Sequence, residues 1–242
     1  MLLASMSRAY QNLEQQGKAE QKITESLEYL NNKGNQISSS EGLQTSVLVK
    51  VNQGKLLSDK YKKQAIKAYR EAFNILINYP KETNPLKENQ LLTSEDIELV
   101  HIALLGLINN ENQLQFRQEI RDSLRKYLFG ELEYFLKRQD WEEADKKTWK
   151  LMLFIANREK ESSLDIPQVN NFPCSELKKI DDLWVENSGG KFGFSVQKKI
   201  WIKTGNRLGI KPSDWNNNDI EIIIISEPLL DGMPKKKNMG MK

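Results

Sequence analysis

The segment from Asn171 to Trp201 constrains the fold of this chain more than any other part of the sequence. It reads NFPCSELKKIDDLWVENSGGKFGFSVQKKIW, with two apolar-patterned stretches around the run Asn187-Ser188-Gly189-Gly190-Lys191. Adjacent glycines reach positive φ angles without steric cost, so this run predicts a tight turn. The two flanking stretches are therefore expected to fold against each other.

The stretch before the turn has the pattern of an amphipathic helix. Its apolar residues recur at spacings of three and four, which places Leu177, Ile180, Leu183 and Trp184 on one side of a helix. The lysines and aspartates between them fall mostly on other sides. A helix with one apolar face is the expected structure.

The stretch after the turn changes its period. Phe192, Phe194 and Val196 alternate, and Ile200 and Trp201 then follow at helical spacing. We expect an extended segment that leads into a second helix, with an aromatic wall beside lysines.

The motifs of this segment resemble a known family. The order FPC, IDDLW and GGKFGFSVQKKIW is similar to the signature of the genomes-uncoupled-four family, the porphyrin-binding regulators of magnesium chelatase in oxygenic phototrophs. Upstream, the segment 132–156, LEYFLKRQDWEEADKKTWKLMLFIA, resembles the first helix pair of that family's core domain. The resemblance covers residues 127 to 215, and FGFSVQ beside an LW-bearing helix is its most specific part.

Length and composition favour two modest domains. The chain has 242 residues, of which 38% are hydrophobic and 29% charged, with a net charge of +3. We predict an all-α protein with an N-terminal helical bundle or short helical-repeat domain in residues 1–122. An α-helical porphyrin-binding core is predicted in residues 123–242. No apolar run reaches the length of a membrane span, and the N-terminal residues lack the pattern of a secretory or transit signal.

The N-terminal third predicts helices with polar interruptions. Residues 45–57 are ambiguous between helix and strand, because Val47, Val49 and Val51 alternate while other apolar residues do not. Ser58 and Asp59 stand where the N-cap of the next helix is expected, and Pro80 is expected to stop that helix. A further helix is predicted to begin at the cap sequence Thr93-Ser94-Glu95-Asp96.

No constellation of residues indicates catalysis, so the protein is expected not to be an enzyme. His101 is the one histidine, on an apolar helix face, and is expected to be structural. Cys174, the one cysteine, is expected to be small and buried at a helix start. Ser195 lacks a GxSxG context and a nearby histidine. Asp181 and Asp182 are adjacent on a helix and point apart, so a solvated face or a salt bridge to Lys178 is expected.

Nucleic-acid binding has little support. The net charge is small, and the run Lys235-Lys236-Lys237 more often only solubilises a terminus. A binding module for another ligand class remains.

The resemblance implies a ligand, partners and a location. The ligands would be protoporphyrin IX and Mg-protoporphyrin IX, and the partner would be the large porphyrin-binding subunit of magnesium chelatase. The protein would stimulate the chelatase in chlorophyll biosynthesis without making a bond itself, and no cofactor would act as a catalyst. The location would be the chloroplast stroma or the cyanobacterial cytoplasm, and peripheral membrane association is compatible with it.

The candidate site follows from the shape of a porphyrin. A flat macrocycle asks for an apolar slot with cations at its mouth, where the propionates emerge. The resemblance places Ile166 and Val169 in the cup, and the aromatic wall would face them. Lys191, Lys198, Lys199 and Arg207 are chosen for the propionates by location. The full set of candidate ligand-binding residues is Ile166, Val169, Phe172, Lys191, Phe192, Phe194, Val196, Lys198 and Arg207.

The aromatic candidates have a second interpretation, in which Phe192, Phe194 and Trp184 are simply core residues. No metal ligand is predicted, because no histidine lies in residues 123–242; a bound magnesium would take water or another oxygen ligand.

The sequence departs from the family after Trp215. The long covering loop and the arginine-containing helix of similar proteins do not follow, and the run IIIISEPLLDGMPKKK comes instead. A binder without this loop would hold its ligand in an open cup with weaker affinity. The alternative function is a helical protein–protein interaction or sensor module that has lost tetrapyrrole binding. That alternative expects Ile166, Val169 and Phe194 to be buried in a closed core, whereas a binder is expected to present a concave opening there.

Overall fold

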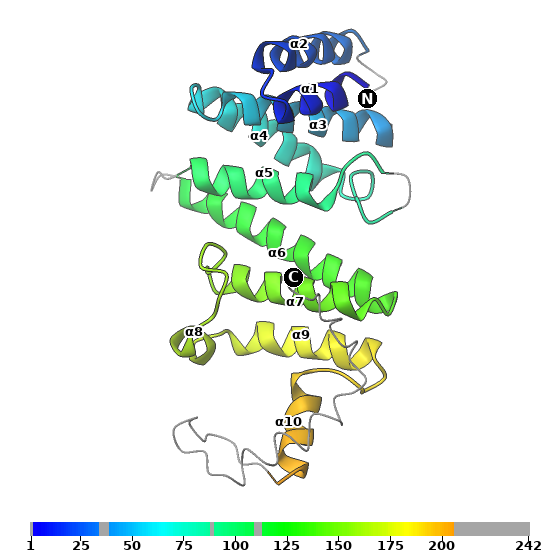
Figure 1. Ribbon diagram of the computed structural model, residues 1–242, viewed down its shortest axis with the longest axis vertical. Coiled ribbons are helices and arrows are strands. Elements are labelled where there is room, and N and C mark those ends of the chain that lie inside the picture. The colour runs from blue at the N-terminus through cyan, green and yellow to red at the C-terminus, as the bar shows by residue number, and fades with distance from the viewer. Residues whose placement is uncertain (1, 34–38, 88–89, 109–112, 206–242) are drawn as a thin grey trace, which may run out of the picture. The chain divides into compact units, whose positions relative to one another are not determined.

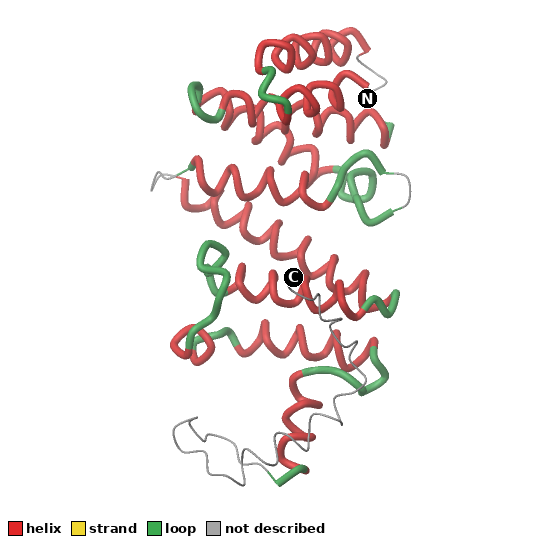
Figure 2. The backbone as a smooth tube through the Cα atoms, in the orientation of Figure 1, coloured by secondary structure: helices red, strands yellow, loops and turns green. Residues whose placement is uncertain are grey.

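The computed structural model describes residues 2–33, 39–87, 90–108 and 113–205. Within these ranges every regular element is a helix (Figure 2), which confirms the predicted all-α class. The chain divides into two units, Met1–Tyr127 and Leu128–Lys242, and the dividing point lies inside helix α6. None of the described helices is both long and apolar enough to cross a membrane.

In the first unit, helices that are neighbours in sequence pack against each other (Figure 1). Helix α1 pairs with α2, α3 with α4, and α4 also contacts α5. The bounds are α1 Leu2–Asn12, α2 Gln16–Lys33, α3 Ser40–Leu57, α4 Lys62–Asn78 and α5 Ser94–Leu107, followed by the first half of α6, Leu114–Lys137.

The core of the first unit forms between α3, α4 and α5. Tyr69 and Phe73 of α4 are almost fully buried, with Val47 of α3 and Val100 of α5 in the same cluster. Helix α3 approaches α4 closely at Gly54, where an added Cβ would lie 2.6 Å from the Tyr69 ring. Only glycine leaves room for that ring, so the helix pairing depends on one missing side chain.

The boundaries of these helices confirm some predictions and correct one. The ambiguous segment is helical throughout as part of α3. The expected N-cap at Ser58 and Asp59 is wrong: α4 is preceded by Tyr61 as its N-cap residue, without a side-chain cap bond. Ser58 is instead the C-cap residue of α3, in the right-handed helical conformation, and its hydroxyl donates to the Gly54 carbonyl at 2.7 Å, so it belongs to the end of α3 and not to the start of α4. Thr93 caps α5 as predicted, in a capping box with Asp96.

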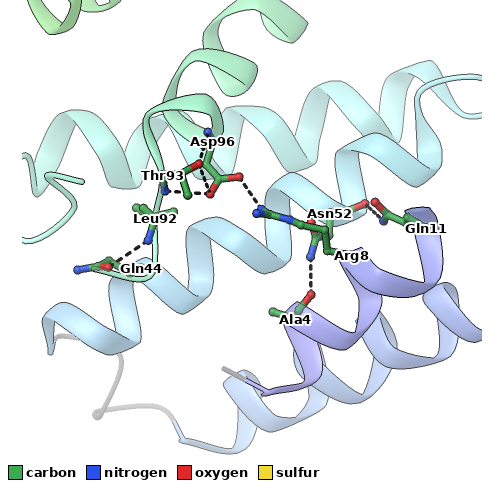
Figure 3. Close-up of polar contacts among 8 residues, drawn as sticks. All are labelled: Ala4, Arg8, Gln11, Gln44, Asn52, Leu92, Thr93 and Asp96. Carbon is green, nitrogen blue, oxygen red and sulfur yellow. Dashed lines mark hydrogen bonds and ion pairs between the residues drawn. The ribbon is translucent and has the colours of Figure 1, made fainter. Parts of the chain in front are cut away.

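Polar contacts connect α1 to α3 and α5 (Figure 3). The Asn52 side-chain amide of α3 donates to the Ala4 carbonyl at 2.8 Å, and the Gln11 amide donates back to the Asn52 carbonyl at 3.1 Å. The Arg8 guanidinium forms an ion pair with Asp96, the carboxylate of the α5 capping box. Helix α1 therefore docks through small and polar residues more than through large apolar ones.

His101 is a buried structural residue, as predicted. It is 1% exposed on α5, beside the Phe73 ring. Its Nδ1 lies 2.7 Å from the Ile97 carbonyl oxygen, which can only accept, so Nδ1 carries the proton. Nε2 is then the acceptor for the Ser123 hydroxyl at 3.0 Å. Burial lowers the pKa of His101 from 6.5 to about 4.

The second unit contains the rest of α6, α7 (Trp141–Ile155), α8 (Ile166–Asn170), α9 (Cys174–Asn187) and α10 (Phe194–Lys203) (Figure 1). The large apolar side chains that are fully buried in its described part come from three helices: Leu132 and Leu136 from α6, Leu151 from α7 and Ile180 from α9. Asp140 caps α7 by accepting from the Glu143 amide at 3.3 Å.

A buried ion pair joins α6 to α7 in this unit. The Lys147 ammonium lies 2.9 Å from the Glu131 carboxylate, and the Glu131 side chain is 0% exposed. Lys147 also lies over the Phe135 ring. A fully buried carboxylate is tolerated because a cation accompanies it.

Two predictions for the second unit are wrong. The segment after the turn is not extended as far as Val196, because α10 already begins at Phe194. Residues two apart on a helix point about 200° away from each other, so Phe194 and Val196 do not form the flat wall that an extended strand would give. Cys174 is exposed rather than buried, because the first residue of α9 projects from the helix end.

Candidate functional site

The turn that follows α9 is closed by one serine. Ser188 is buried, and its hydroxyl oxygen accepts from the Lys191 amide at 3.2 Å and the Phe192 amide at 2.9 Å. Gly189 and Gly190 have φ angles of 61° and 79°, which confirms the glycine-dependent turn expected from the sequence.

The chain then runs back along α9 before α10 begins. The Ser195 amide of α10 donates to Asp181 Oδ1 at 2.9 Å, and Asp181 lies midway along α9. Asp181 is seven residues from Cys174, or about 10 Å along the helix axis at about 1.5 Å per residue. The first turn of α10 therefore lies beside the middle of α9, closer to the N-terminus of α9, which follows α8, than the turn at Ser188 does.

Three aromatic rings from α7, α9 and the turn pack together. Trp141 stacks on Trp184 with ring centroids 6.1 Å apart. The Phe192 ring packs against both in a T-shaped arrangement, with its centroid 5.2 Å from that of Trp141 and 6.2 Å from that of Trp184. The Trp184 indole donates to the Thr148 hydroxyl of α7 at 2.8 Å. The half-buried Phe192 is thus part of an internal cluster that joins the turn to α7.

The apolar residues of α8 are exposed. Asp165 caps this short helix by accepting from the Gln168 amide at 3.2 Å. Ile166 and Val169 are three residues apart, hence on one face, and they are 74% and 58% exposed. Phe172, just before α9, is 8% exposed and so packs into the unit instead.

The candidate cations are exposed where they are described. Lys191 belongs to the turn, and Lys198 and Lys199 project from α10. Arg207 lies outside the described residues. Phe194 and Val196 are half-buried on the first turn of α10.

The adjacent carboxylates of α9 have different surroundings. Asp182 forms the expected ion pair with Lys178, at 2.6 Å on the exposed side of the helix. Asp181 is not on a solvated face, because it binds the α10 backbone. Sequence reasoning missed this role of Asp181, and also the parts of Trp141 and Thr148 in the aromatic cluster. Trp141 and Thr148 both lie in the WEEADKKTW run of the upstream motif, which was the available signal.

The geometry around Ser195 gives no support for nucleophilic chemistry. The only histidine is buried in the first unit, and the Ser195 amide serves the contact between α9 and α10. Among the described residues, no group of three or more histidine, cysteine, aspartate or glutamate side chains could hold a metal ion. What the second unit offers is an exposed apolar face on α8 and lysines on α10.

A family model matches the C-terminal part of this chain. Residues 122–222 match the family described as GUN4-like, the family that the sequence motifs indicated. A protein of Arabidopsis thaliana named "Tetrapyrrole-binding protein, chloroplastic" is 36% identical over 78 residues, which is 31% of this chain and 29% of that protein.

Algal and cyanobacterial proteins match as well. The Pyropia yezoensis protein named "Uncharacterized protein ycf53" is 30% identical over 122 residues, which is 50% of this chain and 48% of that protein. A Synechocystis "Ycf53-like protein" is 36% identical over 76 residues, covering 31% of this chain and 33% of its own.

The chain spans less than half the length of these relatives. No solved structure matches it. The relatives come from plastid-bearing organisms and a cyanobacterium, in agreement with the location that the motifs implied. The C-terminal part of this chain, residues 122–222, is therefore similar to the GUN4-like family.

Proposed function

We propose that this protein is a non-catalytic tetrapyrrole-binding regulator. It binds protoporphyrin IX and Mg-protoporphyrin IX, docks on the large porphyrin-binding subunit of magnesium chelatase, and raises chelatase activity in a plastid or a cyanobacterium. The name of the Arabidopsis relative supports the ligand class. The chelatase and the two named porphyrins follow from the family resemblance of the FPC, IDDLW and FGFSVQ motifs.

The observation that carries the proposal is the exposure of Ile166 and Val169. Exposed isoleucine and valine side chains on one face of a helix leave apolar surface in water, and a bound planar apolar ligand would cover it. The alternative, an interaction module with a closed core at this place, expects Ile166, Val169 and Phe194 to be buried. Phe194 is half-buried, but Ile166 and Val169 are exposed. Their exposure favours the binder.

The energetics require more than one apolar wall. Covering about 150 Å² of one macrocycle face contributes about 4 kcal/mol, at about 25 cal/mol per Å². Micromolar affinity corresponds to about 8 kcal/mol, after association costs are met. A second apolar surface must therefore contact the macrocycle. Phe194 is the candidate for it, because the first turn of α10 lies back along α9.

A titration tests the binding step directly. All five tryptophans follow residue 140, so quenching of tryptophan fluorescence reports on the second unit. We expect saturable quenching by protoporphyrin IX, weakened at least about tenfold by Ile166→Asp, because the charge removes apolar contact and adds a desolvation cost. Ile102→Asp is the matched control, since Ile102 is also an exposed isoleucine, 52%, but lies in the first unit.

Two results would count against the proposal. Non-saturable quenching by the wild-type protein would refute binding. Equal affinity of the Ile166→Asp and wild-type proteins would refute the assigned surface. The regulatory part is tested separately, by measuring magnesium chelatase activity with and without the protein; no stimulation, despite tight porphyrin binding, would leave a tetrapyrrole sensor instead.

A further inference from the structure

Helix α10 begins without a cap of its own. Its N-cap residue is Gly193, which has no side chain, and no side-chain cap bond forms there. The first-turn amides of a helix need acceptors, and a side chain at the N-cap normally supplies one to the second or third residue. Here Asp181 of α9 takes that place, with its Oδ1 2.9 Å from the Ser195 amide nitrogen.

The contact between α9 and the start of α10 is close on both sides of Asp181. Gly193 has a φ angle of 133°, a backbone conformation that residues with a side chain rarely adopt. A Cβ at this residue would lie 2.7 Å from Asp181 Oδ1 and 2.8 Å from Val185 Cγ2. The backbone of Gly193 therefore rests directly on α9, and a carboxylate stands at the positive end of the α10 dipole.

The neighbouring carboxylate provides a contrast. Asp182 is paired with Lys178 on the exposed side of α9, in a bond of the kind that contributes little to stability. Asp181 and Asp182 are both aspartates of α9, but of the two only Asp181 binds the backbone of another helix. A substitution of Asp182 is therefore the matched control for a substitution of Asp181.

We propose that Asp181 is a positioning residue for tetrapyrrole binding. It holds the first turn of α10 on α9, and that turn carries Phe194 and leads to Lys198, two candidate ligand contacts. Asp181 itself does not touch the ligand. This inference rests on the proposed function, and it adds a residue whose effect on binding passes through the placement of α10.

The test compares three variants of the full chain. Asp181→Ala removes the acceptor, Asp181→Asn keeps an acceptor oxygen without the charge, and Asp182→Ala removes the neighbouring carboxylate. Far-UV circular dichroism verifies folding. Hydrogen exchange of the α10 amides measures the contact, and titration with protoporphyrin IX measures the affinity. The induced circular dichroism of the bound porphyrin, at saturating protein, measures the geometry of its site.

We expect Asp181→Ala to speed exchange at the start of α10 about tenfold, as expected for loss of a charge-assisted cap. Its porphyrin affinity should fall about five- to tenfold, with an altered induced signal at saturation. Asp181→Asn should recover most of the affinity, and Asp182→Ala should match the wild-type protein in every measurement. A loss of global stability alone would not change the induced signal of a saturated site.

The outcomes separate this inference from the proposed function. If the wild-type protein binds porphyrin and Asp181→Ala binds it equally well while α10 exchange is faster, the positioning role is overturned and the proposed function stands. If α10 exchange is unchanged in Asp181→Ala, the structural contact itself is refuted. If the wild-type protein does not bind, the proposed function fails, and with it any role of Asp181 in binding.

Discussion

Acidification should destabilise the first unit through His101. The pKa of this residue falls from 6.5 in the unfolded chain to about 4 in the folded protein, because burial disfavours the imidazolium. Between these values the unfolded state binds a proton that the folded state does not. Stability therefore decreases as pH falls from 6.5 toward 4, and the contribution of His101 is constant above that window.

The magnitude follows from the width of the window. Each pKa unit corresponds to about 1.4 kcal/mol, so going from pH 7.5 to pH 5.0 should lower the free energy of unfolding by about 2 kcal/mol through His101. Carboxylates also titrate as the pH falls, and a His101→Gln variant allows their effect to be subtracted. Urea unfolding followed by far-UV circular dichroism at both pH values gives the difference.

The titration can also be observed directly. Since the chain has one histidine, its imidazole carbon–proton signal in NMR needs no assignment. The expected midpoint in the folded protein is near pH 4. A midpoint near 6.5, or the same pH dependence of unfolding in the wild-type and His101→Gln proteins, would refute the reasoning.

Two further predictions concern packing. Gly54→Ala should destabilise the first unit by about 1–3 kcal/mol in urea unfolding, because the new Cβ meets the Tyr69 ring. The control, Gly106→Ala, should be neutral or stabilising, because nothing lies within 4 Å of its Cβ. Equal effects of the two substitutions would contradict the assigned contact between α3 and α4. Lys147→Met should cost about 3 kcal/mol by leaving the Glu131 carboxylate buried without that cation, and adding Glu131→Gln should restore part of the loss; no cost for the single variant would contradict the buried pair.

Local sequence was a good guide to helices and turns. The periodicity before the turn, the glycines at the turn and the Thr93 cap all act within a few residues, and each was confirmed. The same local logic failed at Ser58, because α3 continues to Leu57 with Ser58 as its C-cap, and α4 begins only at Lys62. It failed again at Phe194, where the alternation with Val196 wrongly indicated an extended segment.

The candidate site depended on contacts between segments distant in sequence. Nothing near Asp181 in the sequence indicates that its carboxylate reaches the Ser195 amide, fourteen residues away. The packing of Phe192 against Trp141 and Trp184 likewise needs the three-dimensional structure. Ile166 and Val169 became candidates only through the family resemblance, and their exposure had to come from the structure, since isoleucine and valine side chains are more often buried.

The central claim is that this chain binds a tetrapyrrole. Its most direct test is an absorption titration of a fixed concentration of protoporphyrin IX with the purified protein, following the Soret band. We expect a shifted Soret band that saturates at one porphyrin per chain, with micromolar or tighter affinity. A Soret band that does not shift, or that changes linearly with protein and equally with an unrelated helical protein, would contradict it.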